Sequence, residues 1–329
     1  MEALKVTFIN VGYGEAIMLE CPAADRPDGV FYMLMDAGGR REEEFAGNTT
    51  GRIPAAEYLK RAGIPRLDAI LCTHPHEDHV SGLVEVIAAY TPERFYVSLP
   101  AAYYRRMRPL SETLTENPNR LNMIHALEDY REICETLARR GTEIVMPPRG
   151  SVIPLADALS MRMLGPEEGT AERSAAELER IYALAEEGAE AFIGPFTAFD
   201  GSLNNRCLVT RLDYGDARLL FAGDTNKDGF SYIPFGELKA DIYLCGHHCQ
   251  MDGTDAALLN AIRPKAVICC ASSDRRYDSA HPELFRLIEE SGAEILCSDC
   301  PPVLRGEVPP HNALLLTVSR DGSFTAEYR

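Results

Sequence analysis

Residues 73–79 (THPHEDH) place three imidazoles and two carboxylates within one short segment. His74 and His76 are two residues apart, and the proline between them stiffens the backbone, so both can chelate one ion from an extended segment. Asp78 and His79 can then face a second ion. A polar loop whose histidines only cap the next helix would explain the same residues, but it does not require this spacing. The segment therefore predicts a site for two metal ions.

The flanking segments predict that this motif lies on a loop between a strand and a helix. Residues 67–72 (LDAILC) form an apolar run typical of a buried strand, and residues 80–90 (VSGLVEVIAAY) carry apolar residues at helical spacing. A loop in that position can aim several side chains at one point. Strand and helix patterns alternate in both halves of the chain, which indicates an α/β fold.

The motif resembles that of the metallo-β-lactamase superfamily of metallohydrolases. Further segments extend the resemblance over nearly the whole chain, in the order and spacing of the branch related to the hydrolase domain of the competence protein ComEC. They are residues 10–16 (NVGYGEA), 34–39 (LMDAGG), 204–209 (NNRCLV), 221–224 (FAGD), 238–241 (LKAD), 246–248 (GHH) and 280–282 (AHP). The resemblance implies a four-layer αββα sandwich, with the ligand loops gathered along one edge where the two sheets meet.

The same resemblance implies one hydrolase domain over residues 1–329 with two helical insertions. The first, near residues 101–141, has the apolar spacing of a helix that ends at Gly141, and the second, near residues 167–200, is rich in Glu and Ala. The second insertion is either a solvent-facing addition or a lid or dimer contact, because insertions near a catalytic face often form lids. A homo-oligomer is therefore one expected form of the protein.

The resemblance also implies the ligands of two divalent ions, Zn²⁺ or Mn²⁺. Asp224 resembles the superfamily's bridging ligand, since the two oxygens of a carboxylate can touch both ions. The implied first site is His74, His76, Asp224 and Asn205, and the implied second site is Asp78, His79, Asp224 and His248.

Asn205, the histidine pair 247–248 and Asp36 add detail to this ligand set. Asn205 stands where most members have a third histidine, and an amide oxygen shifts the preference of the first site from Zn²⁺ towards Mn²⁺. Sequence alone leaves His247 and His248 interchangeable, although the resemblance favours His248 as the ligand. We expect Asp36 to orient a ligand histidine from behind, because a ligating imidazole normally donates its other nitrogen to a carboxylate or carbonyl.

Catalysis would use a hydroxide held between the two ions, and three residues are candidates to assist it. We expect Asp78 to orient that hydroxide. His247 and His281 are candidates to protonate the leaving group or to stabilise negative charge, roles that suit groups titrating near neutral pH. His281 precedes Pro282 at the start of a helical pattern, so a helix-start residue is an equal interpretation.

The net charge of −17 at pH 7 limits the partners of the chain. Repulsion disfavours long duplex DNA but not a short anionic substrate, which Arg275 and Arg276 could hold by a phosphate or carboxylate. The favoured interpretation is a phosphodiesterase acting on a small molecule or on short or single-stranded nucleic acid. Hydrolysis of a carboxylic ester, lactone or thioester is the alternative reaction. A non-catalytic metal-binding scaffold is the alternative of a different class.

The sequence predicts no association with a membrane. No apolar run reaches the length needed to cross a bilayer, and the first ten residues already have the pattern of a strand, which leaves no room for a signal peptide. We therefore expect a cytoplasmic protein.

Overall fold

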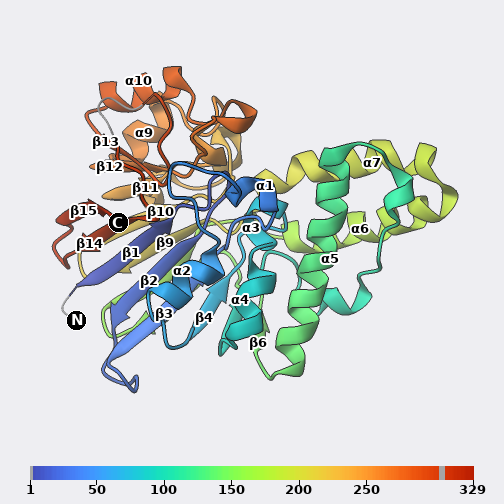
Figure 1. The fold of residues 1–329 in the computed structure, drawn as a ribbon, viewed down its shortest axis with the longest axis horizontal. Coiled ribbons are helices and arrows are strands. Elements are labelled where there is room, and N and C mark those ends of the chain that lie inside the picture. The colour runs from blue at the N-terminus through green and yellow to red at the C-terminus, as the bar shows by residue number, and fades with distance from the viewer. Residues whose placement is uncertain (1–2, 304–307) are drawn as a thin grey trace.

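Two sheets lie face to face in the computed structural model, which describes residues 3–303 and 308–329 (Figure 1). Within these residues the first sheet has eight strands in the order β15-β14-β1-β2-β3-β4-β5-β6. They are β1 (Leu4–Ile9), β2 (Ile17–Pro22), β3 (Val30–Met35), β4 (Ala69–Leu71), β5 (Arg94–Tyr96), β6 (Glu143–Val145), β14 (Ala313–Val318) and β15 (Phe324–Tyr328).

The second sheet has seven described strands in the order β13-β12-β11-β10-β9-β8-β7. They are β7 (Val152–Ala156), β8 (Leu159–Met163), β9 (Thr210–Tyr214), β10 (Ala217–Phe221), β11 (Ile242–Leu244), β12 (Ala266–Cys269) and β13 (Glu294–Cys297). β7 shows how a strand can lack a sequence signal. This edge strand contains Pro154 and has no fully buried residue, so it lacks the apolar alternation by which a strand is recognised.

Parallel pairing brings the ends of several strands to the same edge of the molecule. β3 is parallel to β4 in the first sheet, and β10 is parallel to β11 and β11 to β12 in the second. Because the carboxyl ends of parallel strands point the same way, the loops that follow β3, β4, β10 and β11 can meet. These loops contain the residues that the sequence motifs single out.

Three groups of buried apolar side chains separate four layers. One group fills the space between the two sheets, and the other two lie between each sheet and the helices on its outer face. The helices of the first face are α2 (Ala55–Arg61), α3 (Glu77–Val80), α4 (Leu83–Ala89) and α5 (Pro118–Arg139); those of the second are α8 (Phe235–Leu238), α9 (Ala256–Ile262) and α10 (Pro282–Glu290). The αββα sandwich implied by the sequence is therefore confirmed.

The two helical insertions form a bundle that projects from one side of the sandwich (Figure 1). α5 packs there against α6 (Thr170–Glu187) and α7 (Ala189–Ser202). The predicted insertion near residues 167–200 divides into two helices, because Gly188, with a φ of 115°, ends α6 and turns the chain into α7. Phe192, Phe196 and Phe199 fix α7 by burying one face of it.

Short helical segments complete the described elements. They are α1 (Glu42–Phe45), η1 (Tyr103–Arg106), η2 (Glu112–Leu114), η3 (Leu203–Arg206), η4 (Lys227–Phe230), η5 (His247–Cys249) and η6 (Arg276–Asp278). None of the helices in residues 3–303 and 308–329 combines the length and apolar character that a membrane span requires.

Candidate metal centre

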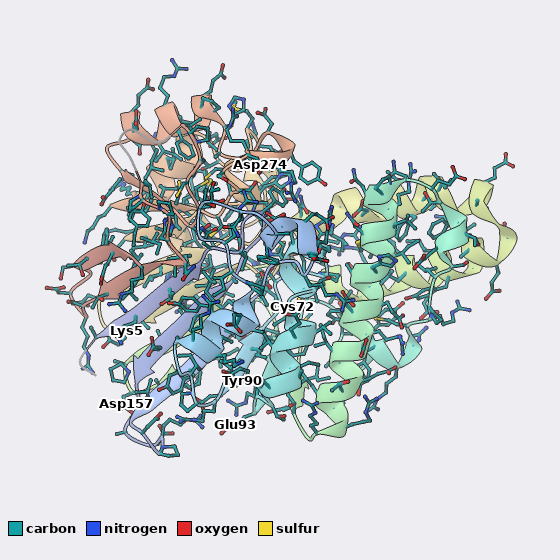
Figure 2. The ribbon with its side chains drawn as sticks, in the orientation of Figure 1. Lys5, Cys72, Tyr90, Glu93, Asp157 and Asp274 are labelled. Carbon is teal, nitrogen blue, oxygen red and sulfur yellow. The ribbon has the colours of Figure 1, made fainter. Side chains whose placement is uncertain are left out.

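Four strand ends deliver the candidate ligands to one point. Asp36 follows β3, and the loop after β4 begins at the buried Cys72, which Figure 2 labels near the middle of the molecule. Asp224 follows β10, and His247 and His248 follow β11. Loops from both sheets therefore meet at the edge of the sandwich.

The motif itself divides between a loop and a helix. His74 and His76 lie on the extended segment after β4, whereas Asp78 and His79 lie in the first turn of α3. The sequence pattern placed the start of this helix at Val80, because the apolar spacing begins there. Two carboxylates in the first turn favour an earlier start, since negative charge stabilises a helix N-terminus.

One group of four residues surrounds a candidate site. Oδ1 of Asp224 lies 3.1 Å from Nε2 of His79 and 3.2 Å from Nε2 of His248. Nε2 of His248 also lies 3.0 Å from Oδ2 of Asp78. One ligand atom from each of the four residues lies within 4.8 Å of the others, which is compact enough for one ion.

A second group shares Asp224 with the first. Nε2 of His74 lies 2.9 Å from Nδ1 of His76 and 3.8 Å from Oδ2 of Asp224. The carboxylate of Asp224 thus turns one oxygen to each group. That arrangement allows it to bridge two ions and to hold them at a fixed separation.

Unpaired buried atoms indicate that these groups fit metal ions. Nε2 of His79, Nε2 of His248 and Oδ1 of Asp224 are buried without a hydrogen bond, although they lie close together. Both imidazoles are 0 % exposed. Divalent cations would supply the missing partner for all three atoms.

Each buried candidate ligand histidine makes a hydrogen bond through Nδ1, the ring nitrogen that faces away from the site. Nδ1 of His79 bonds to Oδ2 of Asp36 at 2.8 Å, as the sequence predicted for that aspartate. Nδ1 of His248 lies 2.7 Å from the carbonyl oxygen of Cys270. Nδ1 of His74 lies 3.1 Å from Oγ1 of Thr73, which also donates to Asp36. These bonds fix the rings so that the opposite nitrogens face the site.

The carboxylates and imidazoles stabilise each other's charged forms. Burial alone would raise the pKa of Asp224, but the imidazoles of His248 and His79 outweigh it and hold that pKa well below its usual range. Burial conversely opposes a charge on His79, yet the carboxylates of Asp224, Asp78 and Asp36 raise its pKa well above its usual value. A metal ion would replace the protons of these imidazoles, so binding should release protons.

Two predicted catalytic residues, His247 and His281, lie outside the two ligand groups. His247 lines the adjoining cavity, and Nδ1 of its ring lies 2.8 Å from Oδ1 of Asp252. His281 lies outside the residues that line the cavity, and its Nδ1 accepts from the N–H of Glu283 at the start of α10. The structure thus places His281 as the helix-start residue of its alternative interpretation.

Asn205 is not among the residues that line the cavity beside the other predicted ligands, and its place in the first site stays a prediction. Its Oδ1 accepts from the N–H of Asn226 at 3.1 Å. Asn204 instead lines the cavity beside His76 and Asp224, and its own Oδ1 is buried without a hydrogen bond. Successive residues of a tight helical segment such as η3 point about 120° apart, so only one of the two amides can face the site.

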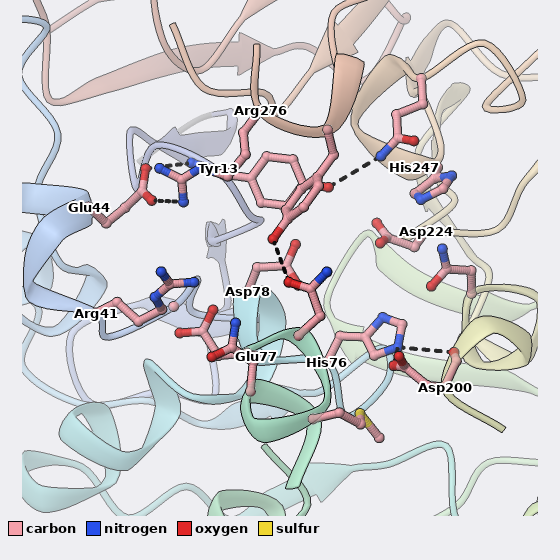
Figure 3. A pocket seen from close by; sticks show the side chains of 17 residues that line it. Tyr13, Arg41, Glu44, His76, Glu77, Asp78, Asp200, Asp224, His247 and Arg276 are labelled. Carbon is pink, nitrogen blue, oxygen red and sulfur yellow. Dashed lines mark hydrogen bonds and ion pairs between the residues drawn. The ribbon is translucent and has the colours of Figure 1, made fainter. Parts of the chain in front are cut away.

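A cavity of about 320 Å³ opens beside the ligand groups. His76, Asp78 and Asp224 form one wall (Figure 3). The rest of the lining includes two tyrosines, two arginines, and polar residues from the insertion helices, namely Tyr13, Tyr277, Arg41, Arg276, Asn119, Asn122 and Asp200. The volume is at the lower end of that of small-molecule sites.

Sequence reasoning missed several of these residues, for different reasons. Tyr13 lies inside a quoted motif (NVGYGEA), but nothing in its spacing indicates that its ring lies 4.5 Å from that of His248. Asn119 and Asp200 belong to the helical insertions, where no motif marks them. Their place at the cavity depends on how α5 and α7 pack.

Comparison with known proteins assigns the family. The chain belongs to the metallo-beta-lactamase superfamily, whose family model matches residues 31–273. It is 22% identical over 307 residues to ComE operon protein 3 of Bacillus subtilis (strain 168), a match covering 90% of this chain and 32% of that protein. The chain thus spans about a third of the length of this relative. The metal-dependent hydrolase class implied by the motifs is confirmed, and the similarity to ComE operon protein 3 agrees with the expected ComEC-like branch.

Solved structures with a similar fold are more distant. Zinc-bound PqqB from Methylobacterium extorquens is 12% identical, with a TM-score of 0.43, covering 87% of this chain and 85% of that one. AidC, a dizinc quorum-quenching lactonase, is 15% identical, with a TM-score of 0.36, covering 96% of this chain and 79% of that one. These likenesses leave the substrate of this chain open.

Proposed function

We propose that this chain is a dinuclear metal-dependent phosphodiesterase that acts on a small molecule or on short or single-stranded nucleic acid. The observation that supports it best is the bridging position of Asp224, with one oxygen towards each ligand group, at the wall of a cavity that also carries arginines. The first metal site would consist of His74, His76 and Asp224, and the second of Asp78, His79, Asp224 and His248.

Asp78 and His247 would assist the reaction beside the two ions. Two bound divalent ions would lower the pKa of a water between them and polarise the oxygen of the scissile group. Asp78, whose Oδ2 faces Nε2 of His248, would accept a hydrogen bond from that water and orient it. His247 is fixed by Asp252 through Nδ1, and in its doubly protonated form it would donate the Nε2 proton to the leaving group.

Asn204 would take the role that the sequence assigned to Asn205. Its buried and unpaired Oδ1 lies in the wall that contains His76 and Asp224. An amide oxygen there can contact the first ion or the substrate. It would add oxygen character to that site and favour Mn²⁺ alongside Zn²⁺.

Two arginines at the cavity, each paired with a carboxylate, would contact an anionic substrate of limited size. Arg276 lines the cavity and is held by the carboxylate of the buried Glu44, which Arg52 pairs from the other side at 2.8 Å. Arg41 lines the same side. A guanidinium with a fixed orientation is suited to bind a phosphate or carboxylate at two points.

Metal analysis and a substrate panel test this function. The purified chain should bind two divalent ions and hydrolyse bis-p-nitrophenyl phosphate with added Mn²⁺ or Zn²⁺, and His76→Ala should reduce that activity at least about 100-fold. Lactone, carboxylic ester or thioester turnover in its place would favour the alternative reaction. Failure to bind a transition metal under any reconstitution would contradict the dimetal site, and metal binding without turnover of any substrate would favour the scaffold.

A further inference from the structure

We propose that Asp200, in the last turn of α7, is a positioning residue that completes the first metal site through His76. Oδ1 of Asp200 lies 3.2 Å from Nε2 of His76, and the carbonyl oxygen of Asp200 lies 3.3 Å from the same nitrogen. The two residues are 124 positions apart in the chain. Figure 3 shows this contact at the edge of the cavity.

The contact sets the tautomer of His76. Its Nδ1 faces Nε2 of His74 at 2.9 Å, so Nδ1 is the atom that a metal would use. A neutral imidazole with a bare Nδ1 carries its hydrogen on Nε2, and that N–H donates to Asp200. A carboxylate acceptor fixes the ring orientation and increases the basicity of the ligand nitrogen.

A comparison of the four candidate ligand imidazoles shows what Asp200 adds. His74, His79 and His248 find their partners in segments that follow strands of the sandwich, namely Thr73, Asp36 and Cys270. His76 alone among the four takes its partner from a helical insertion. The first site is therefore incomplete without α7.

The packing of α7 makes this partner rigid. Phe192, Phe196 and Phe199 are each at most 2 % exposed and belong to the apolar group beneath the first sheet's helices. Phe199 directly precedes Asp200, so this packing fixes the backbone from which the carboxylate projects. The insertion thus couples its own folding to the affinity of one metal site, which goes beyond a solvent-facing addition.

The inference rests on the proposed function in so far as His76 is a metal ligand. We expect Asp200→Ala to weaken metal binding at the first site about 10- to 100-fold, and Asp200→Asn to weaken it less, because the amide keeps an acceptor but loses the charge. The second site should keep its affinity in both variants. The exposed Glu190→Ala, on the same helix, is the matched control and should leave both sites unchanged.

Competition between the full-length protein and a chromophoric chelator, with Zn²⁺ and with Co²⁺, measures the two affinities separately. Circular dichroism and the melting temperature of the metal-free variants report on α7. Wild-type affinity at both sites in Asp200→Ala would overturn the inference, and so would an equal loss at both sites with a lower melting temperature, since that indicates a structural role. Failure of the wild-type protein to bind metal would instead overturn the proposed function and this inference with it.

Discussion

Asp36 must adopt an unusual backbone conformation and accept several hydrogen bonds, and a short acidic or amide side chain suits both requirements. It has a positive φ of 53°, a conformation that Asn and Asp tolerate best among residues with a side chain. Its two oxygens accept from the N–H and Oγ1 of Thr73 at 2.8 and 2.6 Å and from His79 at 2.8 Å. The residue therefore ties the ligand loop to the ring of His79.

Asp36→Asn should weaken the second metal site without disturbing the backbone. The amide suits the same φ but loses the negative charge that orients and polarises His79, so we expect about a 10- to 100-fold lower affinity. Chelator competition measures it, with the exposed Asp25→Asn as control. Equal affinities in the wild-type protein and the Asp36 variant would contradict this role.

Glu77 should make the metal-free protein less stable as pH rises. Burial, aided by the charge of Asp78, raises the pKa of Glu77 from its usual 4.5 to about 7. Because the folded state then binds more protons than the unfolded state between these values, the free energy of unfolding falls as pH rises through this window. Gln at this position can still accept from the N–H of Arg40 without the charge.

The prediction is that Glu77→Gln is more stable than the wild-type chain at about pH 8, by roughly 2 kcal/mol, and nearly equal to it at about pH 4. Urea unfolding with a chelator present measures the difference. The exposed Glu85→Gln should change stability at neither pH. A gain of the same size at both pH values would show that the ionisation of Glu77 is not its cause.

Single residues differ in how far the sequence could predict them. The ligand motif and Asp224 are recognisable because chemistry fixes their type and spacing, and the structure brings them together. Asn204 and Asn205 differ only in which side of η3 they occupy, a choice that a one-residue shift reverses. Asp200 has no local signal, because its contact with His76 depends on the packing of α7.

At the scale of elements, the loops after β10 and β11 approach each other closely, and this approach determines the geometry of the candidate metal centre. Gly246 joins β11 to the two histidines, and a Cβ placed on it would lie 2.0 Å from the carbonyl oxygen of Thr225 in the loop after Asp224. Backbone atoms cannot yield as a flexible side chain can. The absence of a side chain at Gly246 therefore lets Asp224 and His248 reach one site.

Gly246→Ala should separate these loops and affect the second site most. We expect a loss of about 1–3 kcal/mol of stability, as in other overpacked sites, together with weaker metal binding. Thermal unfolding and chelator competition measure both effects. Gly236→Ala is the matched control: it has open space around it and lies in α8, so an alanine there should be neutral or slightly stabilising.

Elements were predictable where burial imposes a pattern. β4 is buried along its whole length, and the apolar run of residues 67–72 predicted it. β7 is an edge strand with a proline, and the break between α6 and α7 rests on one glycine, so neither produces a strong pattern. Tertiary packing decides such elements, and a single sequence does not contain that information explicitly.

The four-layer arrangement confirms the fold at the scale of the whole molecule, while one domain over residues 1–329 stays a prediction. The net charge of −17 acts at this scale too, because it repels any polyanion that approaches the cavity. Added salt screens that repulsion over a distance of about 10 Å at 0.1 M. The ligands and arginines at the cavity act over shorter distances, where screening matters less.

The proposed hydrolysis of short single-stranded DNA should therefore become more efficient as salt rises from low concentration. We expect kcat/KM for a short oligonucleotide to increase about two- to fivefold between roughly 10 and 150 mM monovalent salt, because screening removes long-range repulsion. The monoanion bis-p-nitrophenyl phosphate feels this repulsion less and should change little, which makes it the internal control. A nuclease with a basic binding face shows the opposite trend, since salt weakens its phosphate contacts. A fall in kcat/KM for the oligonucleotide alone would show that a local cluster of cations, rather than the net charge, governs the approach of the substrate.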